Sequence, residues 1–354
     1  MPLFENKTIV ITGGTGSLGK VLTRRLLSEE EGKPKKIIIF SRDEAKQHFM
    51  RVEYQQMQEA TDEVIYHNFE RLLEFRIGDV RDFHSVSSVL RGADIVINGA
   101  DLKQVPSCEY FPFQAVQTNI AGAENIVRVI REHDLPVETV VGVSTDKACK
   151  PINVMGMTKA IQERLFIAAN ISKPSTRFIC VRYGNVLASR GSVIPLFHEQ
   201  IKNGGPVTIT TEDMTRFLLP LEQAVDTIFA AIRMGNAGET FVPKVASSLI
   251  TDVARALIED RKVEMKITGI RPGEKIHEIM VSDEEAWHTY ERDGYLVIRP
   301  MLPELLKDIE EGEFLPKEYS SEDHIMTFKE TIDFLMLHNL LIGQGIKGNG
   351  EFLR

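Results

Sequence analysis

The fold of this chain is decided by Thr8-Ile9-Val10-Ile11-Thr12-Gly13-Gly14-Thr15-Gly16-Ser17-Leu18-Gly19. The first five of these residues are β-branched, which is typical of a buried parallel strand. The residues from Lys20 to Glu30 have the apolar spacing of a helix. Glycines between a strand and a helix let the backbone approach a pyrophosphate, and the helix N-terminus adds free N–H groups and a positive dipole end. We therefore predict a dinucleotide-binding loop, with contacts from Gly13, Thr15, Gly16, Ser17, Leu18 and Gly19.

The end of the second predicted strand, at 36–40, indicates which dinucleotide binds. Enzymes that use NAD usually place a carboxylate here for the ribose 2′-hydroxyl. This chain has Ser41 and Arg42 first, and Asp43 only after them. A guanidinium can hold a 2′-phosphate through two hydrogen bonds. Ser41 and Arg42 therefore favour NADP, and Asp43 leaves NAD as the alternative.

Two later strand ends add to the predicted cofactor site. Asp79 and Val80 follow a strand at 73–77, where a carboxylate can reach the adenine amino group. Ala100 comes shortly after a strand at 94–97 and is expected beneath the nicotinamide ribose. Because the carboxyl ends of parallel strands meet at one edge of a sheet, we expect these residues to lie in one crevice.

Strands and helices alternate through about residue 183, a pattern typical of a doubly wound parallel sheet with right-handed crossovers. We predict an α/β Rossmann-type fold with an NADP-binding domain at 1–183. A smaller C-terminal substrate-binding lobe is predicted at 184–300, where loops and short elements are expected to dominate. The segment 238–242 reads as a strand that returns to the sheet. The remaining predicted elements are strands at 138–143 and 177–182, long helices at 114–133 and 153–170, and helices at 302–311 and 328–341 within a C-terminal extension at 301–354.

The composition is that of a globular enzyme. The chain has 354 residues, of which 43% are hydrophobic and 26% charged, and its net charge of −9 gives no basic footprint for nucleic acid. No apolar run approaches the ~18 residues that cross a bilayer, and the early first strand leads us to expect no signal peptide. The three cysteines are odd in number and lack metal-ligand spacing, so we expect no metal site and a reducing cytoplasm.

Taken in order, the motifs resemble those of one group of enzymes. The chain is similar to the extended short-chain dehydrogenase/reductases, and within them to the UDP-N-acetylglucosamine 4,6-dehydratases that invert carbon 5. The resemblance covers nearly the whole chain. Besides the glycine loop, it rests on Ser41-Arg42-Asp43-Glu44, Gly78-Asp79-Val80-Arg81-Asp82, Leu102-Lys103-Gln104-Val105-Pro106, Thr118-Asn119, Ser144-Thr145-Asp146-Lys147-Ala148, Pro151-Ile152-Asn153, Arg182-Tyr183-Gly184-Asn185-Val186, Met214-Thr215-Arg216-Phe217 and Arg271-Pro272-Gly273-Glu274-Lys275.

The resemblance implies a redox cycle on UDP-N-acetylglucosamine that regenerates NADP. A hydride leaves carbon 4, and the resulting ketone acidifies the proton on carbon 5. A base removes that proton while an acid protonates the departing 6-hydroxyl. The hydride returns to carbon 6, and carbon 5 is reprotonated on the opposite face. The implied product is a UDP-2-acetamido-2,6-dideoxy-L-arabino-hex-4-ulose.

The resemblance implies that Asp146 and Lys147 are the acid and the base. Adjacent residues at a strand end can both reach one sugar where the strand breaks into a loop. To act as a base Lys147 must be neutral, so we expect its pKa to fall well below ~10.4 through desolvation, the nicotinamide charge and Lys159. The alternative is an ordinary surface ion pair.

Met155 stands where the related enzymes usually have a catalytic tyrosine. Some members that resemble capsule-sugar enzymes also carry Met at this position. Lys159 matches the lysine that binds the nicotinamide ribose in these enzymes. A thioether cannot accept the proton of the 4-hydroxyl. Three alternatives follow: Lys159 or Lys147 takes this proton, a water chain replaces the phenol, or the site is redox-silent. Asp101 also departs from the usual alanine, and it is either a replacement base or, as we expect, a solvated loop residue.

The substrate contacts implied by the resemblance are arginines suited to a diphosphate and polar side chains suited to the sugar and ribose. They are Lys103, Asn185, Arg216, Arg271 and Glu274, with Ser189, Arg190 and Ser192 as weaker candidates. The resemblance also implies a homo-oligomer, a dimer or a hexamer, that pairs through the helices at 114–133 and 153–170. The alternative functions are a nucleotide-sugar 4-epimerase, a dehydratase of another nucleotide sugar, and a non-catalytic NADP-binding sensor.

Overall fold

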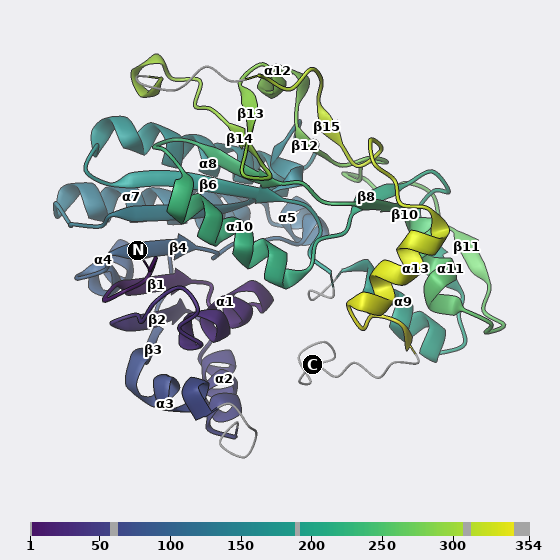
Figure 1. The fold of residues 1–354 in the computed structure, drawn as a ribbon, viewed down its shortest axis with the longest axis horizontal. Coiled ribbons are helices and arrows are strands. Elements are labelled where there is room, and N and C mark those ends of the chain that lie inside the picture. Colours follow the sequence, from purple (N-terminus) through teal and green to yellow (C-terminus); the bar gives the residue numbers. More distant parts are fainter. Residues whose placement is uncertain (1, 57–62, 188–191, 307–312, 343–354) are drawn as a thin grey trace.

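A computed structural model describes residues 2–56, 63–187, 192–306 and 313–342. A nine-stranded sheet crosses this part of the chain in the order β13-β14-β9-β6-β5-β4-β1-β2-β3 (Figure 1). The strands from β3 to β9 pair in parallel, and β14 and β13 add an antiparallel hairpin at one edge. The strands of this sheet are β1 Thr8–Thr12, β2 Lys36–Ser41, β3 Leu73–Ile77, β4 Ile95–Asn98, β5 Thr139–Thr145, β6 Arg177–Tyr183, β9 Thr240–Pro243, β13 Thr289–Arg292 and β14 Tyr295–Ile298.

The predicted α/β Rossmann-type sheet is confirmed. Strand β1 is buried at every position and pairs with β2 on one side and β4 on the other. The strand order reverses between these two neighbours, so a crevice opens at the carboxyl ends of β1 and β4. The strand predicted at 238–242 also lies in the sheet, as β9 beside β6. The hairpin β13–β14 was not predicted.

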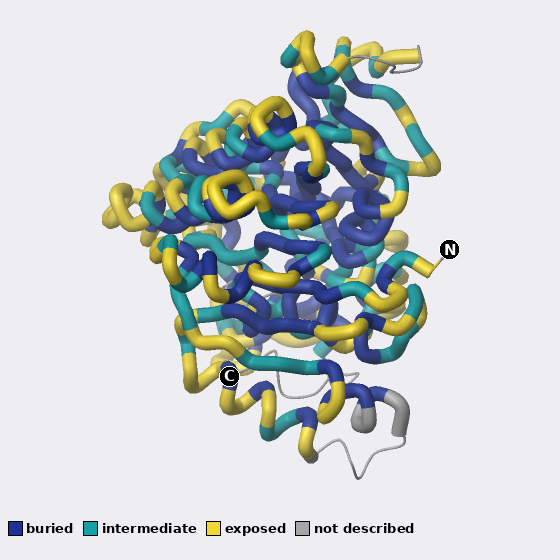
Figure 2. The backbone as a smooth tube through the Cα atoms, turned by 90° about the vertical axis from the view of Figure 1, so that its left-hand side faces the viewer, coloured by how far each residue is buried: buried dark blue, intermediate teal, exposed yellow. Residues whose placement is uncertain are grey.

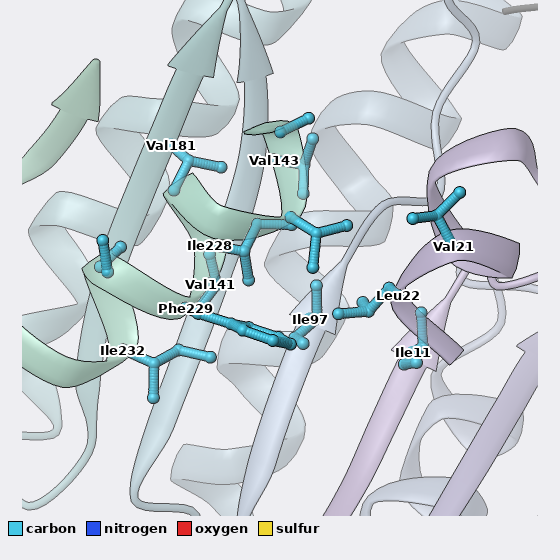
Figure 3. Close-up of a cluster of buried hydrophobic side chains, with 14 of the residues drawn as sticks. Ile11, Val21, Leu22, Ile97, Val141, Val143, Val181, Ile228, Phe229 and Ile232 are labelled. Carbon is cyan, nitrogen blue, oxygen red and sulfur yellow. The ribbon is translucent and has the colours of Figure 1, made fainter. Parts of the chain in front are cut away.

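Helices cover both faces of the sheet. The first face carries α1 Ser17–Leu27, α2 Glu44–Gln56, α3 Glu63–Leu72 and α10 Leu221–Met234, and Figure 3 shows side chains of α1 and α10 meeting those of the strands. The second face carries α4 Phe83–Leu90, α7 Gly122–Glu132 and α8 Val154–Ser172. The buried backbone runs through the middle of the molecule between these layers (Figure 2). The sheet is thus closed to water on both sides, as parallel sheets are.

A second lobe lies beside the sheet, around α9, α11 and α13 (Figure 1). Its own hydrophobic core joins these three helices. Loops and short elements make up most of the described residues between 184 and 300, as predicted, because each strand there has only three or four residues. Three helices of this stretch, α9, α10 and α11, have ten, fourteen and nine residues and were not predicted. The elements of the chain outside the sheet and its two helix layers are α9 Val193–Lys202, α11 Ile250–Ile258, α12 Asp283–Ala286, α13 Phe328–Leu337, β7 Val207–Ile209, β8 Thr215–Phe217, β10 Ser247–Leu249, β11 Met265–Ile267, β12 Ile279–Val281 and β15 Tyr319–Ser320. Of these, β12 and β15 pack on the core of the sheet's first face, and α12 contacts β13.

The C-terminal extension is partly as predicted. The helix expected at 328–341 is present as α13 and docks on α11, where Leu335 is fully buried. Of the helix expected at 302–311, the described residues form only a 3-10 turn at Pro303–Leu305, and residues 307–312 lie outside the described part. The division into segments 1–183, 184–300 and 301–354 stays a proposal. Among the described residues, no helix has the length and apolar character needed to cross a bilayer.

A buried charged cluster ties the sheet to α8 and to the segment that carries β12 and α12. The Arg182 guanidinium, from β6, donates to Glu163 of α8 at 2.7 and 3.0 Å and to Glu285 of α12 at 2.7 and 2.8 Å. It also donates to the carbonyl oxygen of Met280 at 2.8 Å, and Ser144 of β5 donates to Glu163 at 2.5 Å. Burial tends to raise the pKa of Glu285, but Arg182 outweighs it and lowers that pKa to about 2. The carboxylate is therefore ionised at neutral pH.

We expect Arg182→Met to destabilise the fold strongly, because it leaves two buried carboxylates without their partner. Breaking a buried ion pair on one side typically costs ~3–5 kcal/mol. The measurement is urea unfolding followed by circular dichroism. The matched control is Arg128→Met, which removes an exposed pair with Glu132 and should leave the midpoint nearly unchanged. Equal midpoints for the two variants would contradict a structural role for Arg182.

Candidate active site

A cleft of about 1780 Å³ lies at the carboxyl ends of β1, β2, β4, β5 and β6, between the sheet and the second lobe. Sites for single small ligands commonly measure ~300–1,000 Å³. The cleft is therefore large enough for a dinucleotide and a second ligand side by side. Its position at the reversal of strand order is where open α/β sheets bind their ligands.

The glycine loop forms one wall of the cleft, and all six of its predicted contact residues line it. Gly13 has a φ of +68°, and a Cβ there would lie 2.6 Å from the carbonyl oxygen of Gly99. A Cβ on Gly19 would lie 2.3 Å from the carbonyl oxygen of Gly14. Helix α1 begins after Gly16 without a side-chain cap, so its first N–H groups stay available for an anion. The loop thus fits a pyrophosphate.

The residues predicted to bind the adenosine half of the dinucleotide lie farther along this wall. Ser41, Arg42, Asp79 and Val80 all line the cleft, and Ala100 lines it nearer the catalytic turn. Arg42 is half-exposed and its guanidinium lies 3.9 Å from the Asp79 carboxylate. Asp43 turns its carboxylate to Lys46, at 2.7 Å, and accepts from the Lys46 N–H at 3.0 Å. The cation of Arg42 therefore faces the cleft, whereas the Asp43 carboxylate already has partners on its own helix.

The predicted acid and base lie where β5 ends. Thr145 caps a 3-10 turn at Asp146–Ala148, and this turn breaks the strand. The Lys147 ammonium donates to Asp146 Oδ1 at 3.1 Å and to Asn185 Oδ1 at 3.1 Å, and it lies 3.2 Å from Glu278 Oε1. The Asp146 side chain is 1% exposed and that of Lys147 20%. The alternative of an ordinary surface ion pair is therefore wrong.

The electrostatics of this pair differ in part from expectation. Burial raises the pKa of the Asp146 carboxyl, which suits a group that must hold a proton. Burial also tends to lower the pKa of Lys147, but the carboxylates of Asp146 and Glu278 outweigh it and the pKa is raised. The predicted fall in the Lys147 pKa is thus contradicted. The physical reason is the carboxylate of Asp146 itself, joined by a second carboxylate that was not assigned to the site from the sequence.

That second carboxylate is Glu278, which precedes the buried strand β12 and is 2% exposed. It lines the cleft, contacts Lys147 and lies 3.8 Å from the Arg216 guanidinium. One signal was present in the sequence, because Glu278 directly precedes the apolar run Ile279–Val281, where a carboxylate must be paired if it is buried. Its partner Lys147, however, is far away along the chain.

Met155 and Lys159 lie at different depths. Met155 lines the cleft, whereas the described lining does not include Lys159, which is 2% exposed. The Lys159 ammonium donates to the Val143 carbonyl oxygen at 2.6 Å and to Gln162 Oε1 at 2.9 Å. Burial lowers the pKa of Lys159. Asp146 likewise is absent from the described lining and lies just behind it.

Asp101 lies on a loop, as expected, and this loop forms part of the cleft wall. Its side chain is 25% exposed and its carboxylate lies 3.9 Å from the Lys159 ammonium. The next residue, Leu102, exchanges hydrogen bonds with the buried Asn119 side chain, which also donates to Thr158 of α8. Asn119 lies in a π-helical turn, Val116–Ala121, between α6 Pro112–Ala115 and α7. This turn fixes the Asp101 loop beside α8.

The predicted substrate residues come together at the opposite wall. All of them line the cleft: Lys103, Asn185, Arg216, Arg271 and Glu274. Arg216 is buried and donates to the carbonyl oxygens of Thr215, Lys275 and Ile276 at 2.7–2.9 Å, so it also fixes the segment that carries Glu278. Of the weaker candidates, Ser192 lines the cleft, whereas Ser189 and Arg190 lie outside the described residues. The described part of the chain contains no cluster of His, Cys, Asp or Glu suited to a metal ion.

Comparisons with known proteins agree with this geometry. The family model described as polysaccharide biosynthesis protein matches residues 9–300. The chain is 42% identical, over 86% of each chain, to a UDP-N-acetylglucosamine 4,6-dehydratase (inverting) of Campylobacter jejuni. It is 46% identical, over 80% of each chain, to a UDP-glucose 4-epimerase of Rickettsia massiliae. The structure of Pen from Bacillus thuringiensis superimposes with a TM-score of 0.84 at 32% identity, over 96% of this chain and 99% of Pen. The chain therefore belongs to the polysaccharide biosynthesis protein family.

Proposed function

We propose that the protein is an NADP-dependent UDP-N-acetylglucosamine 4,6-dehydratase that inverts carbon 5. One observation carries this proposal: a buried carboxyl with a raised pKa and a lysine lie side by side at the strand end that faces the dinucleotide cleft. A 4,6-elimination needs an acid and a base at adjacent carbons, and Asp146 and Lys147 form such a pair. The 42% identity to the inverting dehydratase of Campylobacter jejuni supports the same reaction.

The roles of the side chains follow from their environments. NADP held by the glycine loop would supply a hydride acceptor for carbon 4 and, once reduced, a hydride donor for carbon 6. Asp146, whose pKa is raised by burial, is suited to donate a proton to the departing 6-hydroxyl. Lys147 removes the proton from carbon 5 once its ammonium has lost a proton. Asn185 accepts a hydrogen bond from Lys147 and so orients its amino group toward the cleft.

The proton of the 4-hydroxyl must leave as the hydride does. Lys159 and Asp101 are the groups beside Met155 that support this step. The pKa of Lys159 is lowered by burial, and the Asp101 carboxylate lies 3.9 Å from its ammonium and lines the cleft. We infer that this pair receives the proton, with a water molecule joining the sugar to it. Of the alternatives given above, proton uptake by Lys159 is thereby favoured over a redox-silent site.

NADP is favoured over NAD by the adenosine end of the cleft. Arg42 faces it with a half-exposed guanidinium, while the Asp43 carboxylate is occupied by Lys46. A 2′-phosphate would gain a charge-assisted contact there, and a 2′-hydroxyl would find no free carboxylate on Asp43. On the opposite wall, Arg271 and Lys103 are suited to the diphosphate of a nucleotide sugar, and Glu274 to ribose hydroxyls.

Two wider proposals concern the state of the enzyme. We propose a homo-oligomer, because large apolar side chains are exposed on neighbouring helices at the edge of the second sheet face: Tyr110 and Phe111 at the end of α5 Val105–Tyr110, Phe113, and Met157 and Ile161 of α8. Exposed apolar patches commonly mark interfaces. We also propose a cytoplasmic location, which suits three free, buried thiols.

A nucleotide-sugar 4-epimerase is the second candidate, since the Rickettsia massiliae relative carries that name. Both activities begin with hydride removal at carbon 4, but an epimerase needs no acid–base pair for carbons 5 and 6. The buried Asp146–Lys147 pair therefore favours the dehydratase. A non-catalytic NADP-binding sensor has Met155 as its only support.

The first prediction tests the reaction itself. Incubation of the enzyme with UDP-N-acetylglucosamine and NADP should give a 4-keto-6-deoxy sugar with inverted carbon 5, identified by NMR. Asp146→Asn should lose this product, because an amide cannot protonate the 6-hydroxyl. Recovery of only the 4-epimer, with Asp146→Asn as active as the wild type, would favour the epimerase. Unchanged substrate from the wild type would support the sensor.

The second prediction concerns cofactor choice. We expect Arg42→Ala to raise the Kd for NADP by ~10–100-fold and to leave that for NAD nearly unchanged, because a hydrogen bond to a charged group contributes ~1.5–3 kcal/mol. Isothermal titration with each dinucleotide measures both constants. Arg76→Ala is the matched control, since Arg76 is exposed and outside the cleft lining. Equal weakening of both dinucleotides by Arg42→Ala would contradict the 2′-phosphate contact.

The third prediction separates Met155 from Lys159. Met155→Ala should reduce turnover by less than about tenfold, because the thioether moves no proton, whereas Lys159→Met should reduce it by ~10²-fold or more. Turnover is measured with saturating NADP, and circular dichroism checks that each variant is folded. If Met155→Ala were as damaging as Lys159→Met at equal cofactor affinity, the division of labour between these residues would be wrong.

A further inference from the structure

We propose that Asn153 is a positioning residue that holds the substrate turn, residues 271–274, against the start of α8, the helix that carries Lys159. This inference rests on the proposed function, because it concerns how the turn is held for a nucleotide sugar. The described cleft lining includes Arg271 and Glu274 but not Asn153. Asn153 therefore acts through these two residues and does not touch the substrate itself.

The substrate turn has the features of a type II β-turn. The N–H of Glu274 donates to the carbonyl oxygen of Arg271 at 3.1 Å, and Pro272 and Gly273 lie between them. Gly273 has a φ of +80°, which the third position of a type II turn requires and which glycine adopts without strain. The Glu274 carboxylate also accepts from the Thr210 hydroxyl at 3.3 Å. The turn thus holds its two end residues next to each other at the cleft.

Both ends of the Asn153 amide have a partner. Its Nδ2 donates to the carbonyl oxygen of Gly273 at 2.8 Å, and its Oδ1 accepts from the N–H of Gly156 at 2.8 Å. A backbone carbonyl can only accept and a backbone N–H can only donate, so these two partners fix the orientation of the amide. The residue is 4% exposed. One buried side chain therefore caps α8 and holds the tip of the substrate turn.

The substrate turn, α8 and the catalytic residues meet closely at this point. A Cβ on Gly273 would lie 3.1 Å from the Cβ of Asn153 and 3.4 Å from Cγ1 of Val105. A Cβ on Gly156 would lie 2.1 Å from the carbonyl oxygen of Lys147. The start of α8 therefore packs on the 3-10 turn that carries Lys147, and Asn153 places the substrate turn relative to both.

Separate contacts hold the chain that follows the substrate turn. The Lys275 ammonium donates to the carbonyl oxygen of Cys149 at 2.6 Å. The Arg216 guanidinium donates to the carbonyl oxygens of Lys275 and of the residue after it, both at 2.9 Å. These contacts begin one residue after the turn, whereas Asn153 binds the carbonyl oxygen of Gly273 within it. Loss of the Asn153 donor should therefore loosen the turn and leave the following segment in place.

Asn153→Asp separates the two hydrogen bonds of Asn153. Its carboxylate keeps the acceptor that caps α8 but has no hydrogen to donate to Gly273. We expect the Kd for UDP to rise by ~3–10-fold, the net effect of losing one hydrogen bond, because Arg271 and Glu274 are no longer held in place. The Kd for NADP should stay unchanged, since the glycine loop is not affected. Isothermal titration with UDP and with NADP measures both constants, and unchanged UDP binding would overturn the inference.

Two further variants exclude other causes. Asn153→Ser is neutral and keeps an oxygen for the cap, but its side chain is one atom shorter, so it should weaken UDP binding as Asn153→Asp does. Weakening by Asn153→Asp alone would indicate charge repulsion of the diphosphate and would contradict the inference. Asp82→Ala removes the side-chain cap of α4, outside the described cleft lining. It should lower the melting temperature and leave UDP binding unchanged; weaker UDP binding here would show a general effect of stability and would also contradict the inference.

A double-mutant cycle tests whether Asn153 acts through the turn. Residues that depend on one another have effects that do not add. The fold-loss of UDP affinity caused by Asn153→Asp should therefore be less than half as large in the Arg271→Ala background as in the wild type. Equal losses in both backgrounds would show that Asn153 and Arg271 act independently, which would overturn the inference.

Turnover gives a second readout and separates this inference from the proposed function. No bond of the nucleotide changes in the reaction, so Asn153→Asp should raise KM for UDP-N-acetylglucosamine and change kcat by less than about twofold. A loss of kcat at unchanged KM would overturn the inference. A wild type that binds UDP but makes a different product would overturn only the proposed reaction. A wild type that does not bind UDP would overturn the proposed function and this inference with it.

Discussion

A single guanidinium group holds the catalytic edge of this protein together. Arg182 is buried at the end of β6 and binds Glu163 of the long helix α8, Glu285 of α12 and the Met280 carbonyl oxygen next to β12. It therefore joins the sheet, the helix that carries Lys159, and the segment that carries Glu278. A buried guanidinium without partners is very unfavourable. The hydrogen bonds of Arg182 therefore hold these elements in the arrangement in which its guanidinium is fully paired. The site is built on that arrangement.

The same edge of the sheet concentrates charge in a dry environment. Arg182, near the end of β6, forms ion pairs with Glu163 and Glu285. A second set of ion pairs joins Lys147 to Asp146 and Glu278, and Glu278 to Arg216. Every one of these groups is paired with opposite charge, as burial requires. The surroundings also shift the pKa values of the two carboxyl groups in opposite directions, since Lys147 and Arg216 lower that of Glu278 whereas burial raises that of Asp146. Structural and chemical demands are thus met by one continuous network.

The sequence predicted the parts of the molecule that depend on local patterns. The parallel strands and the glycine loop follow from β-branched runs and from turns that only glycine fits, such as Gly13. The hairpin β13–β14 was missed although Asp293 and Gly294, both with positive φ, are a local signal for its turn; only its pairing with β9 is a tertiary contact. Helix α10 was not predicted either, although its apolar face packs on the sheet. It lies between Pro220 and Gly235, and prolines and glycines are typical of loops. Glu278 and the raised pKa of Lys147 depend on proximity between distant segments, which no local pattern encodes.

The order of elements along the chain has a consequence for how the protein is made. The sheet takes its last strands from β9, β13 and β14, and the second lobe closes its core only when Leu335 of α13 packs on α11. A ribosome therefore synthesises nearly the whole chain before either part can reach its final packing. Until β9 has been made, β6 is a strand edge without that partner, and α11 lacks its cover until α13 has followed. The nascent protein thus presents apolar surface late in synthesis, which is when chaperones that bind such surface would have most to protect.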